Sequence, residues 1–130
     1  MRAAHGPPAA IALLAVLLIG CSAPMPAEIA RGLPVELRIV DELTPEWAHA
    51  RALNANAIAV RRGHVTETLV AHELVHIMQW RRIGWSFPIV YAHQVATFGY
   101  WDAPLEVEAR RLQGDAFYLA WARDLIREAP

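Results

Sequence analysis

The stretch that decides the fold is residues 66–80, TETLVAHELVHIMQW. Apolar residues recur through it at spacings of three and four, which predicts a helix with one buried stripe. The residues of this stripe are Leu69, Val70, Leu74, Ile77 and Met78. Thr66 is a suitable N-cap, and Gly84 follows Arg81 and Arg82 at the point where such a helix would end. We therefore expect one helix between Thr66 and Gly84.

The predicted helix carries the pattern His-Glu-x-x-His, formed by His72, Glu73 and His76. Because the histidines are four residues apart, they project from one face, about 40° apart, and can hold a single metal ion. Glu73 lies about 100° from His72 around the helix, too far for a comfortable third ligand. It can still reach a water in the open position of the metal and act as general base. Uncharged neighbours on both sides of the histidines favour this interpretation over a solvated His/Glu face.

A zinc hydrolase of this kind needs a third protein ligand. A third histidine six residues after His76 is excluded, because Arg82 stands there. The remaining candidates are Glu106, Glu108, Asp102 and, in an apolar stretch where a core or rim histidine is commoner, His93. Helical pitch places Glu106 and Glu108 about 200° apart, so only one of them can face the metal. The pitch alone does not decide which.

The rest of the pattern predicts a small α+β domain that is mainly helical, with a short β-sheet and the motif helix at its centre. The expected strands are 35–40 and 57–60, and the other expected helices are 45–53, 88–97 and 104–121. Alternation of apolar and charged residues, or a short apolar run, indicates the strands. Pro45 and Pro104 suit the first turns of two of the helices.

At 130 residues the chain holds one domain at most, and its net charge of -1 argues against a nucleic-acid partner. Residues 1–20 predict a signal peptide, because a weakly basic start precedes an apolar run from Ala9 to Ile19. This run is too short to span a bilayer as a helix of the mature protein. It closes on Leu18-Ile-Gly-Cys21, which resembles the lipobox of bacterial lipoproteins, in which the cysteine is lipidated and becomes the first mature residue.

The chain has one cysteine, Cys21, and it stands where a lipobox requires it. An ordinary secretory signal with an incidental cysteine is the alternative. Acylation is favoured because a single free thiol suits an oxidising compartment poorly. In a Gram-negative lipoprotein, Ser22 would favour the periplasmic face of the outer membrane. Residues 21–34, rich in Pro and small residues, then read as a lipid-anchored tether, and 35–130 as the domain.

The motif and a downstream element together resemble a known family. His72-Glu-Leu-Val-His76 followed by Pro104-Leu-Glu106-Val-Glu108-Ala109 is similar to the gluzincins, metallopeptidases whose third ligand is a Glu on a later helix. The likeness covers about Ala57 to Trp121 and is closest to small domains with a Glu-x-Glu-Ala element. In the family's Glu-x-x-Ala-Asp form the ligand stands three residues before the Ala. The resemblance thus implies Glu106 as ligand, with Glu108 as the alternative.

This resemblance implies a zincin-like metallopeptidase domain that hydrolyses peptide bonds of a peptide or protein substrate in the cell envelope. Zn²⁺ would be held by His72, His76 and Glu106, and Glu73 would carry the proton from water to the leaving amine. The candidates for stabilising the oxyanion are Tyr91, Tyr100 and His93. Trp80, Trp85 and Trp101 are candidates for lining a cleft, although core packing is commoner for such residues.

One departure from the family concerns the residue that orients a motif histidine. Arg110 stands where the family has an Asp, and Asp102 or Asp115 are the candidates to replace it. This departure favours a second interpretation, a non-catalytic zincin-like scaffold lipoprotein that binds metal without turnover. A third is a structural lipoprotein without metal, which a zinc measurement would identify.

Overall fold

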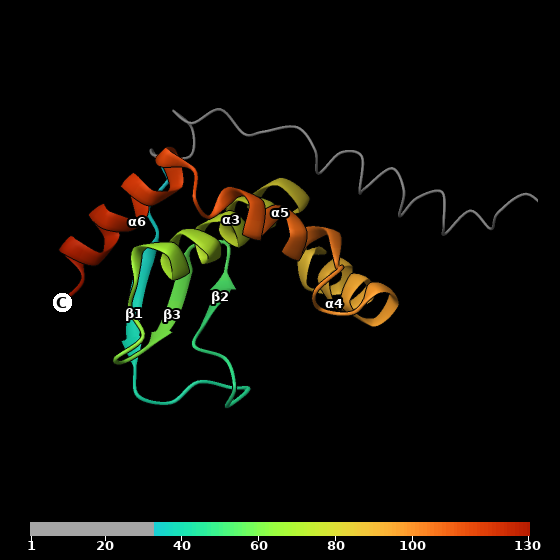
Figure 1. Cartoon of the computed structure of the whole chain (residues 1–130), viewed down its shortest axis with the longest axis horizontal. Coiled ribbons are helices and arrows are strands. Elements are labelled where there is room, and N and C mark those ends of the chain that lie inside the picture. Colours follow the sequence, from blue (N-terminus) through green and yellow to red (C-terminus); the bar gives the residue numbers. More distant parts are fainter. Residues whose placement is uncertain (1–32) are drawn as a thin grey trace, which may run out of the picture.

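The computed structural model describes residues 33–130, so the predicted signal peptide, Cys21 and nearly all of the tether lie outside the described residues. The described part contains three strands and four helices: β1 (Glu36–Val40), β2 (Ala50–Asn54), β3 (Ala57–Arg61), α3 (Glu67–Ile83), α4 (Phe87–Phe98), α5 (Pro104–Leu112) and α6 (Ala116–Glu128). Figure 1 shows a small sheet with α3 lying over it and the other helices grouped around α3. The prediction of a mainly helical α+β domain is confirmed.

The sheet has the order β1-β3-β2, with β3 parallel to β1 and antiparallel to β2. Residues 57–60 of β3 are all buried, as expected for a central strand. The two strand predictions, 35–40 and 57–60, are therefore confirmed. β2 lies at one edge of the sheet and packs against α3.

The predicted helix over 45–53 is wrong, because the chain there forms a loop and then strand β2. The residues of β2, ARALN, suit a helix by intrinsic propensity, but pairing with β3 overrides that preference. A tight turn makes this pairing local, since the side chain of Asn54 accepts a hydrogen bond of 2.7 Å from the backbone N–H of Asn56. Asn-Ala-Asn between two short apolar segments was the hairpin signal.

Helix α3 is the central element, and its ends lie where the sequence predicted them. The side chain of Thr66 accepts a hydrogen bond from the N–H of Leu69, and Gly84 ends the helix with a φ of 87°. The helix packs against α5, α6, β2 and β3, which buries it on several sides. The main core lies between the sheet, α3 and α6 and includes Ile58, Val60, Leu74, Ile77 and Trp121.

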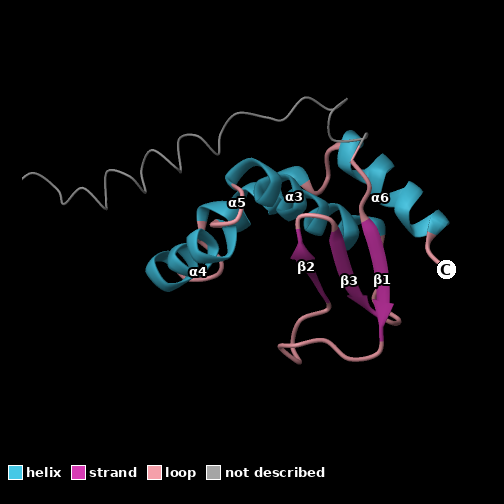
Figure 2. Cartoon of the chain, turned by 180° about the vertical axis from the view of Figure 1, so that it is seen from behind, coloured by secondary structure: helices cyan, strands magenta, loops and turns pink. Residues whose placement is uncertain are grey.

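The predicted helix 104–121 is broken in two at residues 113–115. Asp115 is the N-cap of α6, where its side chain accepts a hydrogen bond of 2.9 Å from the N–H of Phe117. Gly114 next to an N-capping Asp is an ordinary helix-start signal. The break lets α6 turn back along α3 and β1 while α5 crosses α3 near the motif (Figure 2).

Helix α4 lies at the end of the molecule away from α6, in both views (Figures 1 and 2). Its inner face packs on α5 through Phe87, Val90 and Leu105. The side chain of Gln94 accepts a hydrogen bond of 2.9 Å from the N–H of Leu105 and so satisfies a donor in the first turn of α5. Within residues 33–130 no helix is both long and apolar enough to cross a bilayer.

Candidate metal centre

Helices α3 and α5 bring together His72, His76 and Glu106, which are far apart in the sequence. The Nε2 atoms of the two histidines are 3.2 Å apart, and each lies 3.2 Å from an oxygen of Glu106. Glu106 is only 1% exposed. The ligand atoms of these three side chains all lie within 4.8 Å of one another, so the group could hold a metal ion.

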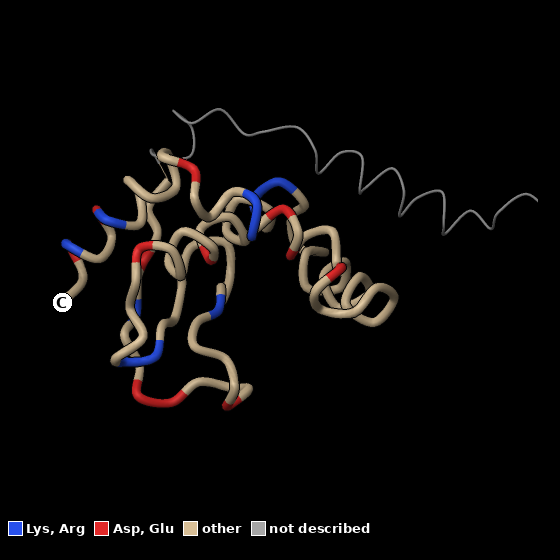
Figure 3. Tube along the Cα trace, viewed as in Figure 1, with Lys and Arg blue, Asp and Glu red and all other residues tan. Residues whose placement is uncertain are grey.

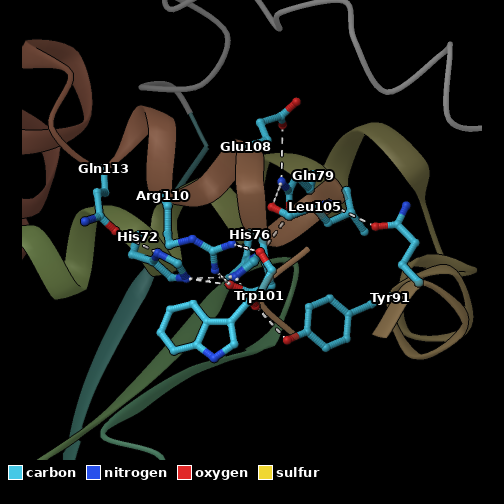
Figure 4. A network of polar contacts seen from close by, with 11 residues as sticks. His72, His76, Gln79, Tyr91, Trp101, Leu105, Glu108, Arg110 and Gln113 are labelled. Carbon is cyan, nitrogen blue, oxygen red and sulfur yellow. Dashed lines mark hydrogen bonds and ion pairs between the residues drawn. The ribbon is translucent and has the colours of Figure 1, made fainter. Parts of the chain in front are cut away.

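Two glutamines orient the histidines from behind. His76 Nδ1 lies 2.8 Å from Gln79 Oε1, and His72 Nδ1 lies 2.9 Å from Gln113 Oε1 (Figure 4). The orientation of the Gln79 amide is determined by its other end, because its Nε2 donates to the carbonyl of Leu105 at 2.9 Å. Because Gln79 Oε1 only accepts, His76 carries a proton on Nδ1 and can direct its Nε2 lone pair at the centre, and Gln113 Oε1 would hold His72 in the same way.

This arrangement fits a cation. Two Nε2 lone pairs and a carboxylate converge at 3.2 Å, where they repel one another unless a positive charge lies between them. Among the residues that the structure describes, Glu106 Oε2 is a buried oxygen without a hydrogen-bond partner. A buried acceptor in that position is costly unless it is satisfied, and a metal ion would satisfy it.

The pKa values of Glu106 and His76 also favour positive charge between these two side chains. Burial acts to raise the pKa of Glu106, but its contacts with His72 and His76 outweigh this, so the pKa lies far below the usual value. Burial acts to lower the pKa of His76, but Glu106 and Glu73 together outweigh it, so that pKa is raised. Glu106 therefore stays ionised, and its negative charge favours a cation at the neighbouring histidines.

Of the two carboxylates that the sequence left open, Glu106 lies beside the histidines and Glu108 does not. Glu108 Oε1 instead accepts hydrogen bonds from Gln79 Nε2 at 3.2 Å and Arg82 Nη2 at 2.8 Å. It therefore supports the glutamine that orients His76. The two side chains diverge as the helical pitch required.

The other acidic and histidine candidates lie elsewhere. Asp115 caps α6, and His93 is exposed on α4, where it contacts Thr97. Asp102 is exposed on the loop before α5. Arg110 lies 3.6 Å from Glu106 Oε2, and its guanidinium sits over the Trp101 ring and donates to the Trp101 carbonyl. Two glutamines, and not an Asp, therefore orient the motif histidines through their Nδ1 atoms.

Glu73 is buried on the next side of α3, facing the edge strand β2. The backbone N–H of Ala52 donates to its carboxylate. Burial raises the pKa of Glu73, and the neighbouring histidines only partly offset this effect. The side chain lines the same cavity as His72 and His76 without joining the group of metal-ligating atoms. Glu73 is thus a buried carboxylate on the wall of the cavity beside the candidate metal ligands.

The three oxyanion candidates fall into different places. Tyr91 donates a hydrogen bond of 2.6 Å to Glu106 Oε1, so its hydroxyl is engaged within the site. Tyr100 lines the cavity, where burial and the charge of Glu106 raise its pKa to about 12. It is therefore a protonated donor across the neutral range. His93 is not among the residues that line the cavity.

A cavity of about 450 Å³ opens beside the group, a volume within the usual range of about 300–1,000 Å³ for small-ligand sites. His72, Glu73, His76 and Glu106 form its polar side. Most of the remaining wall is apolar or aromatic and includes Trp47, Trp80, Phe87, Tyr91, Val95 and Tyr100. Of the three tryptophans that were candidates for a cleft or, more commonly, for core packing, Trp80 lines this cavity, whereas Trp85 and Trp101 are largely exposed.

No family model, curated protein or solved structure is significantly similar to this chain. The residues of the centre that sequence reasoning missed are Gln79 and Gln113. Gln79 stands three residues after His76, on the next turn of the same helix, where an acceptor can reach its Nδ1. The spacing of three residues could therefore have indicated this contact from the sequence. Gln113 gave none, because its approach to His72 depends on the break between α5 and α6.

Proposed function

We propose that this chain is a zinc-dependent peptidase of the gluzincin type, held at the bacterial cell envelope by lipid on Cys21. One observation carries the catalytic proposal. Two imidazole lone pairs and a buried carboxylate converge on one point, and a second buried carboxylate, Glu73, lies on the adjoining wall of the cavity. A pure metal store has no need of the second carboxylate or of the cavity.

The donor set supports zinc as the ion. Two histidine nitrogens and one glutamate oxygen form the His₂Glu set of catalytic zinc sites, which leaves a fourth position for water. Mg²⁺ and Ca²⁺ prefer oxygen ligands alone, and Cu(I) prefers sulfur. Gln79 and Gln113 also suit zinc, since a hydrogen bond from Nδ1 to an amide oxygen makes each imidazole a better ligand.

Zinc bound there would supply a Lewis acid and a water of lowered pKa. The residues of the chain would do the rest of the chemistry. Glu73 accepts the proton of the attacking water at its carboxylate and delivers it to the nitrogen of the leaving amine. Tyr91 and Tyr100 both line the cavity and both contact Glu106, and either hydroxyl is a candidate donor to the substrate carbonyl oxygen.

The apolar wall supports a peptide substrate with a large apolar side chain next to the cleaved bond. Phe87, Val95 and Trp80 would bury such a side chain, at a gain of about 25 cal/mol per Å² of apolar surface. The same wall would exclude water other than the attacking one. A charged side chain against Phe87, Val95 and Trp80 would lose its hydration without finding a partner, whereas Arg51, which also lines the cavity, could pair with an acidic one.

The gluzincin resemblance gains support from the position of Glu106. It stands three residues before Ala109, as in the family's Glu-x-x-Ala element, and lies beside the histidines. The lipid anchor depends on Cys21 and its lipobox, which lie outside the described residues. Zinc content and lipid attachment are separate parts of the proposal and can fail separately.

One observation favours the competing function, a metal-binding scaffold without turnover. Arg110 approaches Glu106 Oε2 to 3.6 Å and brings a positive charge to a side of the site where the family has an Asp. A cation there would compete with the metal for the carboxylate. We place this function second, because it gives no role to Glu73.

The test is Glu73→Gln in the full chain, purified in detergent without added metal. We expect one zinc per chain by elemental analysis in both wild type and variant, because Glu73 is not a ligand. Turnover of a library of apolar peptides should fall by about 10²–10⁴-fold, the usual contribution of a general base. Glu67→Gln is the matched control, since Glu67 lies on the same helix in an exposed ion pair with Arg123.

Each outcome has a distinct meaning. A well-folded wild type without metal would exclude both zincin proposals. Zinc without cleavage of any peptide would favour the scaffold. Full activity of Glu73→Gln would show that another group is the base.

A further inference from the structure

One wall of the cavity beside the metal centre carries no charge. Helix α4 contributes Phe87, Tyr91 and Val95 to this wall, and α3 adds Trp80. Residues 87–98 include no Asp, Glu, Lys or Arg, so α4 is tan along its whole length in Figure 3. A charged group of a bound peptide therefore finds no ion-pair partner on this side of the cavity.

The other wall contains the only Lys or Arg among the described residues that line the cavity. This wall consists of β2 and the loop before it, and its lining residues are Pro45, Trp47, Ala48, Ala50, Arg51 and Ala52. In both views β2 is the strand nearest α4 (Figures 1 and 2). Arg51 is also the only charged residue of β2. The cavity thus combines an uncharged wall with a wall that carries one positive charge.

The guanidinium of Arg51 is held in place and still has donors available. Its Nη1 donates a hydrogen bond of 2.8 Å to the carbonyl of Thr44, at the start of the loop that lines the cavity. Within residues 33–130 its Nε and Nη2 have no partner, and the residue is exposed. These two nitrogens form one side of the guanidinium fork, which matches the two oxygens of a carboxylate. Arg123 binds Glu67 in this way, through Nε at 3.0 Å and Nη2 at 3.1 Å.

The metal centre lies between the two walls. The centroid of the His76 ring is 5.8 Å from that of Tyr91, so this ligand borders the uncharged wall. Glu73 accepts a hydrogen bond from the backbone N–H of Ala52, so the second carboxylate borders β2. A peptide whose cleaved bond lies between these two residues would place one side of that bond against α4 and the other side toward Arg51.

We infer that Arg51 selects a carboxylate of the substrate, on the side of the cleaved bond opposite a large apolar side chain. This inference rests on the proposed peptidase function and extends it to a substrate class. The carboxylate belongs either to an Asp or Glu side chain or to the C-terminus of the peptide, since both offer the guanidinium the same two oxygens. A basic residue in that position is disfavoured, because like charges would face each other.

Two matched pairs of peptides test the inference by binding, without any need for turnover. The first pair is amidated at the C-terminus and contains Phe next to Glu, in either order, with Glu replaced by Gln in its second member. The second pair contains Phe but no acidic residue, and compares a free C-terminus with an amide. Kd is measured on the full chain carrying Glu73→Gln, purified in detergent, from the fluorescence of the tryptophans that line the cavity.

The carboxylate member of one pair should bind about 5–10-fold more tightly than its amide partner, a value between those of exposed ion pairs and of buried bonds to charged groups. A preference in the first pair assigns Arg51 to an acidic side chain. A preference in the second pair assigns it to the C-terminus. Equal Kd values within both pairs would overturn the inference.

Variants of Arg51 separate recognition of the peptide from support of the loop. Arg51→Gln should abolish the preference, and Arg51→Lys should keep part of it, since the charge remains while the fork is lost. Arg51→Glu should reverse it in favour of a peptide with Lys in place of Glu. Arg61→Gln is the matched control, because Arg61 Nη2 donates to the carbonyl of Leu43 in the same loop at 3.3 Å but does not line the cavity. Thermal unfolding checks that each variant is folded.

The remaining results distinguish this inference from its competitors. Equal losses of preference in Arg51→Gln and Arg61→Gln would mean that Arg51 acts only through the loop. A preference that survives in Arg51→Gln would assign the carboxylate to another group, such as the metal. Both results would contradict the inference.

The inference and the proposed function can fail separately. If the chain with its native Glu73 cleaves both members of each pair with equal kcat/KM, the peptidase proposal holds and selection by Arg51 is excluded. If it cleaves none of the peptides, but they bind with a preference that depends on Arg51, the peptidase proposal fails and the carboxylate site remains.

Discussion

The two histidines of the centre stand on one helix and bond to the same kind of group, yet their supports differ. His76 relies on Gln79, which is fully buried and is itself bonded to the Leu105 carbonyl and to Glu108. Arg82 completes this network by an ion pair of 2.8 Å with Glu108. His72 relies on Gln113, a partly exposed residue at the end of α5 beside the break (Figure 4).

The difference suggests that one half of the site is rigid and the other adjustable. A buried, fully bonded amide can take one orientation only, because any other leaves a donor or acceptor unpaired. An amide at a helix end next to Gly114 loses little by moving. We expect His76 and Glu106 to hold the metal in position and His72 to adapt to it.

The largest expected effect is that of removing a ligand from the rigid half. His76→Ala should weaken zinc binding by more than the roughly 100-fold that is the usual upper bound for removing a residue that only orients a ligand. Competition with a chelating dye of known affinity measures this. His93→Ala is the control, because His93 is an exposed histidine away from the site. Equal affinity of His76→Ala and wild type would exclude His76 as a ligand.

The second prediction compares the two glutamines directly. Removing a residue that hydrogen-bonds a ligand histidine usually lowers metal affinity by about 10–100-fold. Gln79→Ala should lower zinc affinity toward the upper end of this range, and Gln113→Ala toward the lower end. Gln79→Ala should also destabilise the metal-free chain by about 1–3 kcal/mol, because Leu105 and Glu108 lose a buried donor. Gln113→Ala should change that stability by less than about 0.5 kcal/mol.

Denaturant titration of the metal-free proteins measures the stability part. Equal losses of affinity and stability in the two variants would mean that the two halves of the site are equally rigid. A loss of stability without any loss of affinity would make Gln79 a packing residue only.

A third prediction sharpens the comparison by adding charge. A carboxylate is a stronger acceptor for a ligand histidine than an amide. Gln113→Glu should therefore keep or raise zinc affinity, since its position is partly open to solvent. Gln79→Glu should lower affinity, because the new carboxylate would face Glu108 and the Leu105 carbonyl without a proton to donate. If the two substitutions changed zinc affinity equally, the side chain at position 79 would be free to rotate.

The comparison of the two histidines also shows which features of the site the sequence alone could predict. The motif helix, its caps and the projection of His72 and His76 follow from pitch and short-range capping, which are local properties. Glu106 was a candidate from the resemblance, but choosing it over Glu108 needed the approach of α5 to α3. That approach depends on Gln94 and Leu105 and on the packing of α4, none of which has a local signature.

The two errors in secondary structure have the same cause. Residues 50–54 suit a helix but pair with β3, and residues 104–121 continue an apolar pattern across Gly114. In both places a turn determined the structure although the periodicity favoured a helix. The turns are Asn54-Ala-Asn56 and Gly114-Asp115. The second error mattered for function, since Gln113 reaches His72 only because the helix ends there.

The smallest expected effect concerns Arg110, which borders the adjustable half. Its guanidinium is partly exposed and lies 3.6 Å from Glu106 Oε2, so it competes weakly with a metal for that oxygen. A pair of this kind contributes about 0–1 kcal/mol, and Arg110→Ala should therefore tighten zinc binding up to about fivefold. Arg111→Ala on the exposed side of α5 should have no effect. Added salt should shrink the difference between wild type and Arg110→Ala only in part, because the Arg110 side chain is partly exposed while its Nη1 atom is buried. Weaker binding by Arg110→Ala would instead mean that the arginine, held on Trp101, keeps Glu106 in its binding orientation.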